Sequence, residues 1–201
     1  MNKFKKIFLV FSLVLLLTGC KNLFTYENVH PDYLSGKYYV EMKIKKYGTL
    51  EIELDADTAP ITVTNFLGLV REGFYDGNLI HRVMQNFVIQ GGEDASGSKS
   101  TIKGEFDANG VSNNISHTRG VISMARMGDI SSGFDTASTQ FFIVIEDSPS
   151  LDHYYAGFGK VTKGMEVVDK IAKNVKKTDD MGMILDDEEM PVIEYIKEIE
   201  K

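Results

Sequence analysis

The chain of 201 residues contains no tryptophan and a single cysteine, Cys20. One cysteine excludes a disulfide within the chain and any zinc site built from several thiolates. The longest largely apolar run, from Ile7 to Leu17, has about eleven residues and is too short to cross a bilayer. The four histidines show no i, i+4 pairing of the kind that binds a metal on a helix, so we expect no metal site.

Positive charge is also in short supply, with 22 Lys and Arg against 29 Asp and Glu. The formal net charge is −7, and removal of residues 1–19, which carry three lysines and no acidic residue, lowers it to −10. Nucleic-acid binding depends on basic patches that displace counterions, so we expect no nucleic-acid partner. The remaining composition, 43% hydrophobic and 25% charged, is typical of an ordinary soluble domain.

The N-terminal segment 1–19 has the pattern of an export signal, because three lysines precede its apolar run. It leads into the string LTGC at 17–20, which resembles the lipobox of bacterial lipoproteins. The resemblance implies that Cys20 becomes a lipidated N-terminus, anchored by acyl chains on the extracytoplasmic side of the cell membrane. In the alternative interpretation, Cys20 is an ordinary residue near a signal-cleavage site.

The mature chain is predicted to consist of a tether at 20–37 and one domain at 38–201. The tether contains Pro31 and Gly36 and has neither helical nor alternating apolar periodicity. From Tyr38, two runs of alternating apolar residues flank a turn at 46–48, which predicts a β-hairpin. Its inward-facing residues are expected to be Val40, Met42, Ile44, Leu50, Ile52 and Leu54.

Two later segments have helical spacing, one opening at Ala59-Pro60 and the other running from Gly164 to Asn174. Six further short apolar runs, beginning near positions 79, 87, 120, 139, 157 and 192, predict strands. We therefore expect a mainly β fold, a closed eight-stranded antiparallel β-barrel capped by two α-helices. The inward-facing helical residues are predicted to be Val63, Phe66, Leu67, Val70, Val167, Val168 and Ile171.

Several strings occur together in one order along the chain. They are TVTNFLGLVREG, IHRVMQNFVIQGGE, KGEFDANG, SHTRGVISMAR, TQFFIVI and FGKVTKGMEVVDKI. From about Val40 to the C-terminus they resemble the cyclophilin family of peptidyl-prolyl cis–trans isomerases. The resemblance implies a cyclophilin-like fold and a cofactor-free enzyme that accelerates rotation about Xaa-Pro bonds of flexible polypeptides. We expect the protein to be a monomer.

The resemblance also implies roles for individual residues. Arg82 would be catalytic, because a permanently charged guanidinium can donate a hydrogen bond to the prolyl nitrogen as the amide twists. Gln90 and Gln140 would bind the substrate backbone and hold the arginine in place, and the main chain at Ala125 and Arg126 would line the bound peptide. The apolar pocket for the proline ring would consist of Phe87, Val88, Phe142 and Leu151, with Tyr155 at its rim.

Some of these residues have other interpretations. The four apolar pocket residues have the alternative interpretation of barrel core, where most apolar strand residues lie, and only their place in the motif favours a pocket. His81 and His117 match family positions, and we expect structural hydrogen bonds from both. Ser150 replaces the tryptophan of many cyclophilins, which leaves sensitivity to the family's cyclic-peptide inhibitor open. The loop 127–138 is longer than is usual in the family and is expected to influence which residues beside proline are accepted.

Two other classes of function are alternatives to the enzyme. The first is a non-catalytic chaperone or adhesin that captures proline-rich segments in the same groove. The second is an extracellular solute-binding lipoprotein, which needs a two-lobed architecture that this short, strand-rich chain lacks. The presence of Arg82, Phe87 and Gln90 together favours an isomerase that assists the folding of exported or surface proteins.

Overall fold

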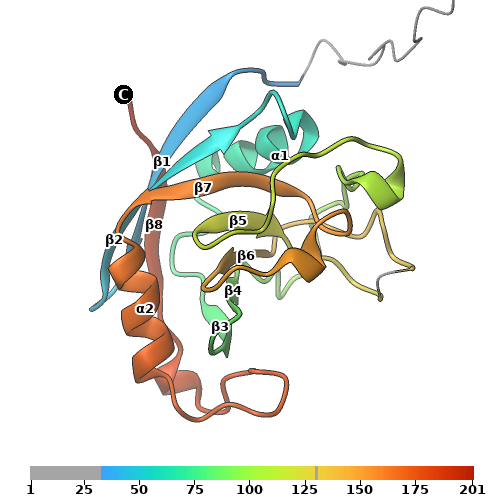
Figure 1. Cartoon of the computed structure of the whole chain (residues 1–201). Helices are drawn as coiled ribbons and strands as arrows, with labels where there is room; N and C mark the ends of the chain where they lie inside the picture. Colours follow the sequence, from blue (N-terminus) through green and yellow to red (C-terminus); the bar gives the residue numbers. More distant parts are fainter. Residues whose placement is uncertain (1–32, 130) are drawn as a thin grey trace, which may run out of the picture.

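A computed structural model describes residues 33–129 and 131–201 (Figure 1). The signal segment, Cys20 and the first part of the tether lie outside the described residues. Within the described part, no helix is long and apolar enough to span a membrane. The strands are β1 (Lys37–Ile44), β2 (Gly48–Asp55), β3 (Ile80–Met84), β4 (Val88–Gly91), β5 (Val121–Met124), β6 (Phe141–Val144), β7 (Gly157–Lys163) and β8 (Ile193–Glu198). The α-helices are α1 (Pro60–Arg71) and α2 (Met165–Asn174), and short 3₁₀ helices cover Asp107–Asn109, Pro149–Leu151 and Asp187–Glu189.

All eight strands belong to one antiparallel sheet, in the order β3-β4-β6-β5-β7-β2-β1-β8. The prediction of a mainly β fold with two α-helices is confirmed, but the prediction of a closed barrel is wrong. Among the described residues, the edge strands β3 and β8 share no ladder and approach through an isolated bridge between Leu79 and Val192. The outer edge of β3 is instead paired with a loop, since Val83 N donates to Gly182 O at 2.7 Å and Ile184 N donates to His81 O at 3.0 Å. The molecule is therefore an open half-barrel.

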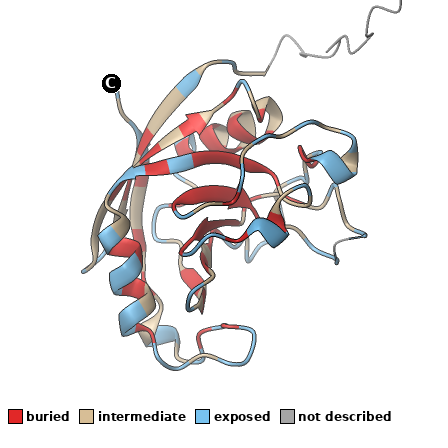
Figure 2. Cartoon of the chain, in the orientation of Figure 1, coloured by how far each residue is buried: buried red, intermediate tan, exposed pale blue. Residues whose placement is uncertain are grey.

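The predicted hairpin is β1 and β2, which pair in register from Lys37 opposite Asp55 to Ile44 opposite Gly48. Because successive side chains of a strand point to opposite faces, the alternating apolar residues all reach one side. The six residues predicted to face inward are fully buried in the main core. Figure 2 shows that the central strands are mostly buried.

Both predicted helices are present, and each has one face against the sheet. Helix α1 begins at Pro60, contacts β8 and β2, and buries the predicted residues Val63, Phe66, Leu67 and Val70. Helix α2 lies beside β2, and Figure 2 shows it with one buried and one exposed face.

The N-terminus of α1 is satisfied by a distant carboxylate. Ala59 offers no side chain that could cap the helix, and Glu105 accepts from the amides of Ile61 at 3.0 Å and Thr62 at 2.7 Å. Glu105 is almost fully buried, and its burial raises the pKa of the carboxyl. The two amide donors and the positive end of the helix favour its charged form. This contact joins the 103–110 segment to the helix.

Candidate active site

Register places a row of polar and aromatic residues across one face of the sheet. Arg82 on β3 is opposite Gln90 on β4, Gln90 is opposite Phe142 on β6, and Phe142 is opposite Ser123 on β5. Residues directly opposite one another in antiparallel strands point to the same face. Segments of the chain up to sixty residues apart are therefore aligned side by side by strand pairing alone.

The Arg82 guanidinium is held by several contacts. Its Nε donates to Met181 O at 2.7 Å, and its Nη1 donates to Gln90 Oε1 at 3.0 Å. Gln90 Nε2 in turn donates to Gln140 Oε1 at 2.8 Å. Partial burial lowers the pKa of Arg82, but an arginine remains protonated throughout the physiological range. The site therefore presents a fixed, oriented positive charge.

A cavity of about 240 Å³ lies beside this guanidinium. Nine of the ten residues to which the sequence assigns catalysis or substrate binding line it together. They are Arg82, Phe87, Val88, Gln90, Ala125, Arg126, Phe142, Leu151 and Tyr155. The pocket thus combines two arginines and one glutamine with a mostly apolar lining.

The tenth residue, Gln140, lines a second cavity of about 310 Å³ that shares Gln90, Ala125 and Arg126 with the first. The remaining lining comes from segments 94–101 and 136–139 and from Met127. The backbone N–H of Ala125 donates to the backbone oxygen of Gln140 at 2.9 Å. This N–H is therefore already paired within the protein. The two cavities adjoin each other at their three shared residues.

The apolar pocket residues belong to a cluster separate from the main core. Val88, Phe142 and Leu151 are buried in this second cluster, and Phe87 and Tyr155 pack against it. Their chain neighbours Ile89, Phe141 and Ile143 lie in the main core. Because side chains alternate along a strand, β4 and β6 supply the core from one face and the pocket from the other.

A buried histidine supports the pocket from beneath. His117 Nδ1 lies 2.9 Å from Asp152 Oδ1, and its Nε2 lies 3.0 Å from Ser123 Oγ, while its ring stacks on Phe142 with centroids 6.1 Å apart. Burial lowers the pKa of His117 despite the neighbouring carboxylate. Ser123 is fully buried, so this Ser-His-Asp arrangement cannot reach a substrate as a nucleophile would. Its contacts are those of a structural support.

His81 has a different environment. It is buried, its pKa is lowered by that burial, and its Nδ1 has no hydrogen-bond partner among the described residues. The structural hydrogen bond expected from His81 is therefore not made by Nδ1.

The side chain of Arg126 points into an aromatic cage rather than standing as a second free cation. Its guanidinium carbon lies 4.7 Å from the centroid of Tyr155 and within 5.4 Å of those of Phe106 and Phe134. Its Nη1 donates to Asp129 O and Ser132 O, both at 2.7 Å. Arg126 thus ties the long loop 127–138 to the pocket rim.

Met181 was missed by the sequence analysis. It lines the cavity, and its carbonyl oxygen accepts from Arg82, although it follows Arg82 by 99 residues. It lies in an irregular segment after α2, and no periodicity or motif there indicated a site. Ser150 is exposed and does not line the cavity.

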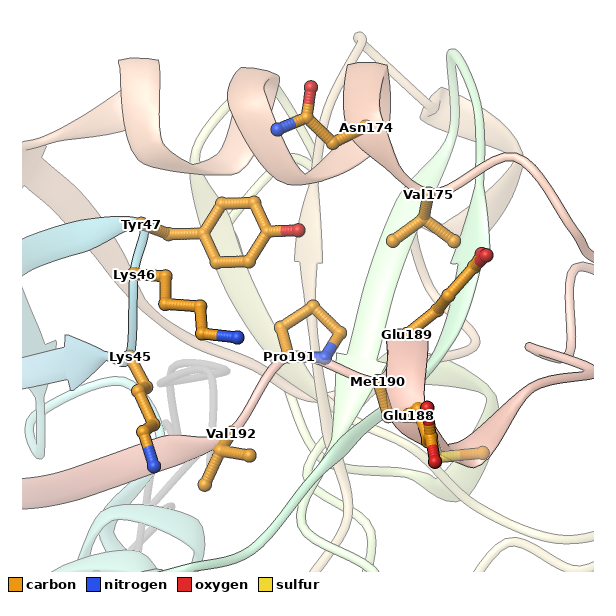
Figure 3. A pocket seen from close by; sticks show the side chains of 10 residues that line it. All are labelled: Lys45, Lys46, Tyr47, Asn174, Val175, Glu188, Glu189, Met190, Pro191 and Val192. Carbon is orange, nitrogen blue, oxygen red and sulfur yellow. The ribbon is translucent and has the colours of Figure 1, made fainter.

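Another pocket, of about 280 Å³, shares no residue with these cavities. Figure 3 shows Lys46 and Tyr47 on one side of it and Glu188 and Glu189 on the other, with Pro191 between them. Among the described residues, no group of three or more His, Cys, Asp or Glu side chains could hold a metal ion.

Comparison with known proteins identifies the family. The family model "Cyclophilin type peptidyl-prolyl cis-trans isomerase/CLD" matches residues 39–194. The chain belongs to the cyclophilin family. This cyclophilin is 43% identical over 131 residues to peptidyl-prolyl cis-trans isomerase A of Dickeya dadantii, covering 63% of this chain and 67% of the relative. It is also 43% identical over 136 residues to peptidyl-prolyl cis-trans isomerase B of Bacillus subtilis, covering 66% and 86% of the two chains.

Solved structures show the same fold. A cyclophilin-type isomerase of Cryptosporidium parvum matches this cyclophilin with a TM-score of 0.69 and 25% identity, covering 83% of this chain and 99% of that one. A second structure, of that protein in the presence of the dipeptide Ala-Pro, matches with a TM-score of 0.68 and 26% identity, covering 81% and 99%. The Arg82 cavity therefore lies in a fold shared with named isomerases.

Proposed function

We propose that this cyclophilin accelerates cis–trans isomerisation of Xaa-Pro bonds in flexible polypeptides, with Arg82 as the catalytic residue. The single observation that carries the assignment is the oriented Arg82 guanidinium beside a cavity of about 240 Å³ that is lined largely by apolar residues. The reaction breaks no covalent bond. It needs a surface that binds the twisted amide more tightly than either planar isomer.

The contribution required of Arg82 can be estimated. The barrier to uncatalysed rotation is about 18–20 kcal/mol, because resonance gives the C–N bond partial double-bond character. Acceleration by about 10⁴- to 10⁵-fold requires roughly 5–7 kcal/mol of preferential binding. One charge-assisted hydrogen bond supplies about 1.5–3 kcal/mol. Arg82 therefore accounts for part of the effect, as the donor to the prolyl nitrogen, which gains a lone pair when conjugation is lost.

The apolar pocket supplies the remainder. Phe142, Val88 and Leu151 form a buried floor that fixes the proline ring while the preceding carbonyl turns. Tyr155 packs edge-on against Phe142 with centroids 5.6 Å apart and closes one side. Water excluded from this pocket strengthens the hydrogen bond from Arg82 at the moment of rotation.

The deciding experiment is an isomerisation assay on a proline peptide, by protease coupling or by NMR exchange spectroscopy. Exchange between the cis and trans signals should accelerate in proportion to protein concentration. The alternative function, a chaperone or adhesin that holds proline-rich segments, predicts peptide binding with unchanged exchange. That outcome would overturn the proposed isomerase activity of this chain.

We further propose that the enzyme is anchored by lipid at Cys20 and acts on newly exported or surface proteins at the extracytoplasmic side of the membrane. The lipobox-like string at 17–20 supports this location. Cys20→Ser should then release the protein from the membrane fraction or leave it unprocessed. Retention of the processed variant in the membrane would contradict lipid anchoring.

Substrate preference beside proline is proposed to depend on the loop 127–138. Met127 and Thr136 of this loop line the second cavity, which adjoins the proline pocket. Shortening the loop should change the relative rates for peptides that differ next to proline more than it changes the rate for an alanine-flanked peptide. Equal changes for all peptides would contradict this role.

A further inference from the structure

Two methionines contact Arg82, Met84 through its side chain and Met181 through its backbone carbonyl. Met84 is two residues along β3 from Arg82, so both side chains are on the same face, and Met84 Sδ lies 3.7 Å from Arg82 Nη2. The carbonyl of Met181 accepts from Arg82 Nε, and Met181 is 64% exposed and lines the cavity. Of these sulfurs, the one within hydrogen-bonding distance of the guanidinium is that of Met84.

A thioether is a weak hydrogen-bond acceptor. Arg82 Nη2 is therefore weakly engaged by Met84, whereas Nε and Nη1 have strong oxygen acceptors at 2.7 and 3.0 Å. The Nη2 donors are the ones best able to turn to a bound prolyl nitrogen. A change that gave the Met84 sulfur a strong acceptor oxygen would compete directly with the substrate for these donors.

We propose that Met84 and Met181 form an oxidation site whose modification suppresses the isomerase; this inference rests on the proposed function. A peroxide is the oxidant. A lone pair on sulfur attacks one peroxide oxygen, the O–O bond breaks, a sulfur–oxygen bond forms, and water leaves after proton transfer. Sulfur is oxidised, the peroxide is reduced, and a reductase for methionine sulfoxide reverses the change.

The sulfoxide oxygen would act in two ways. On Met84, it accepts a charge-assisted hydrogen bond from Arg82 Nη2 and withdraws this donor from the twisted amide. On Met181, which lines the cavity, it adds a polar group to a largely apolar pocket and disfavours entry of the proline ring. The partly exposed Met84 and the exposed Met181 are both open to a small oxidant.

The test treats the purified protein with hydrogen peroxide, locates the sulfoxides by peptide mass spectrometry, and measures isomerase activity before and after. Each variant is compared with its own untreated activity. Treated wild-type protein should lose about ten-fold or more in kcat/KM, the effect of one charge-assisted hydrogen bond. The double variant Met84→Leu, Met181→Leu should lose much less, and the two single variants identify the responsible sulfur.

Met127→Leu provides the matched control, because Met127 is 69% exposed, lines the second cavity and does not line the Arg82 cavity. This variant should lose as much activity on treatment as the wild type, and sulfoxide reductase should restore both. The side-chain Nε–H NMR signal of Arg82 should also shift on oxidation, independently of any substrate.

Three results would overturn the proposal: an equal loss in the double variant, full activity with both sulfurs oxidised, or failure of peroxide to modify either sulfur while Met127 reacts. Failure of the proposed function would be distinguished by an absence of isomerase activity in the untreated wild type. In that case the Arg82 NMR signal would still report whether oxidation redirects the guanidinium.

Discussion

Arg82 and Gln90 face each other on neighbouring antiparallel strands, with Nη1 of the arginine 3.0 Å from Oε1 of the glutamine. Gln90 also donates to Gln140, so a guanidinium and two amides form a continuous hydrogen-bonded chain across β3, β4 and the residue before β6. Gln90 uses its side-chain oxygen for Arg82 and its side-chain nitrogen for Gln140. This polarity fixes the plane of the guanidinium beside the pocket.

Replacement of Arg82 tests the catalytic assignment. Arg82→Ala should lower kcat/KM by about 10- to 100-fold, because one charge-assisted hydrogen bond to the twisted amide is lost. Arg71→Ala is a matched control. Arg71 on α1 is half-exposed, pairs with Glu198 on β8 and does not line the cavity. A protease-coupled assay measures both. An Arg82→Ala enzyme with the wild-type rate would refute the mechanism.

Gln90 is predicted to be a positioning residue for Arg82. Gln90→Leu removes the acceptor for Nη1 and should lower kcat several-fold more than it raises KM. Gln90→Glu retains an acceptor oxygen for the guanidinium and should recover part of the lost kcat, although it loses the donor to Gln140. If both variants had the same kcat, the contact with Arg82 would have no role in the rate.

Phe141 and Phe142 are adjacent on β6 and should give opposite phenotypes. Phe141 packs in the main core against Phe66 and Tyr75, so Phe141→Leu should lower the free energy of unfolding by roughly 1–2 kcal/mol with little effect on KM. Phe142→Leu should instead raise KM for proline peptides, because its ring forms the pocket floor. Chemical denaturation and steady-state kinetics on both variants check this. Identical profiles would show that the two faces of β6 are not functionally separate.

Acid should destabilise the protein through His117. Burial lowers the pKa of His117 in the folded state below its ordinary value of 6.5. Between the folded-state pKa and 6.5, the unfolded chain therefore binds more protons than the folded chain. The free energy of unfolding should therefore fall as the pH drops below about 6.5 and be fully recovered above it. Burial also lowers the pKa of His81, which adds to the same loss of stability in acid. Urea denaturation as a function of pH measures the slope.

His117→Gln should flatten this pH dependence, at the expense of stability at neutral pH. His153→Gln, which changes an exposed histidine, is the matched control. An unchanged slope in His117→Gln would show that another group is responsible for the acid sensitivity.

The local elements could be predicted from the sequence because they follow from short-range periodicity. Alternation in 38–55 and the 3, 4, 7 spacing in 60–71 correspond to β1, β2 and α1. Whether the sheet closes into a barrel or stays open could not be predicted from such patterns. It depends on which groups pair with the outer edge of β3, and residues 182–184 take that place.

The site was accessible to sequence reasoning where it lies on strands with family-like strings, as for Arg82, Gln90 and Phe142. Met181 could not be found in this way, because it contributes a carbonyl oxygen, which any residue could supply. Its position depends on how an irregular segment returns to β3. The alternation of Phe141 and Phe142 between two faces was, in contrast, present in the sequence and indicates where core ends and pocket begins.

The loop that covers β3 has a second effect. An exposed strand edge offers free amides and carbonyls to the edges of other molecules and promotes self-association. Here the segment that blocks that edge also supplies the Met181 carbonyl that orients Arg82. Resistance to aggregation and catalytic competence are thereby coupled in one stretch of chain, and a deletion that frees the strand should impair both at once.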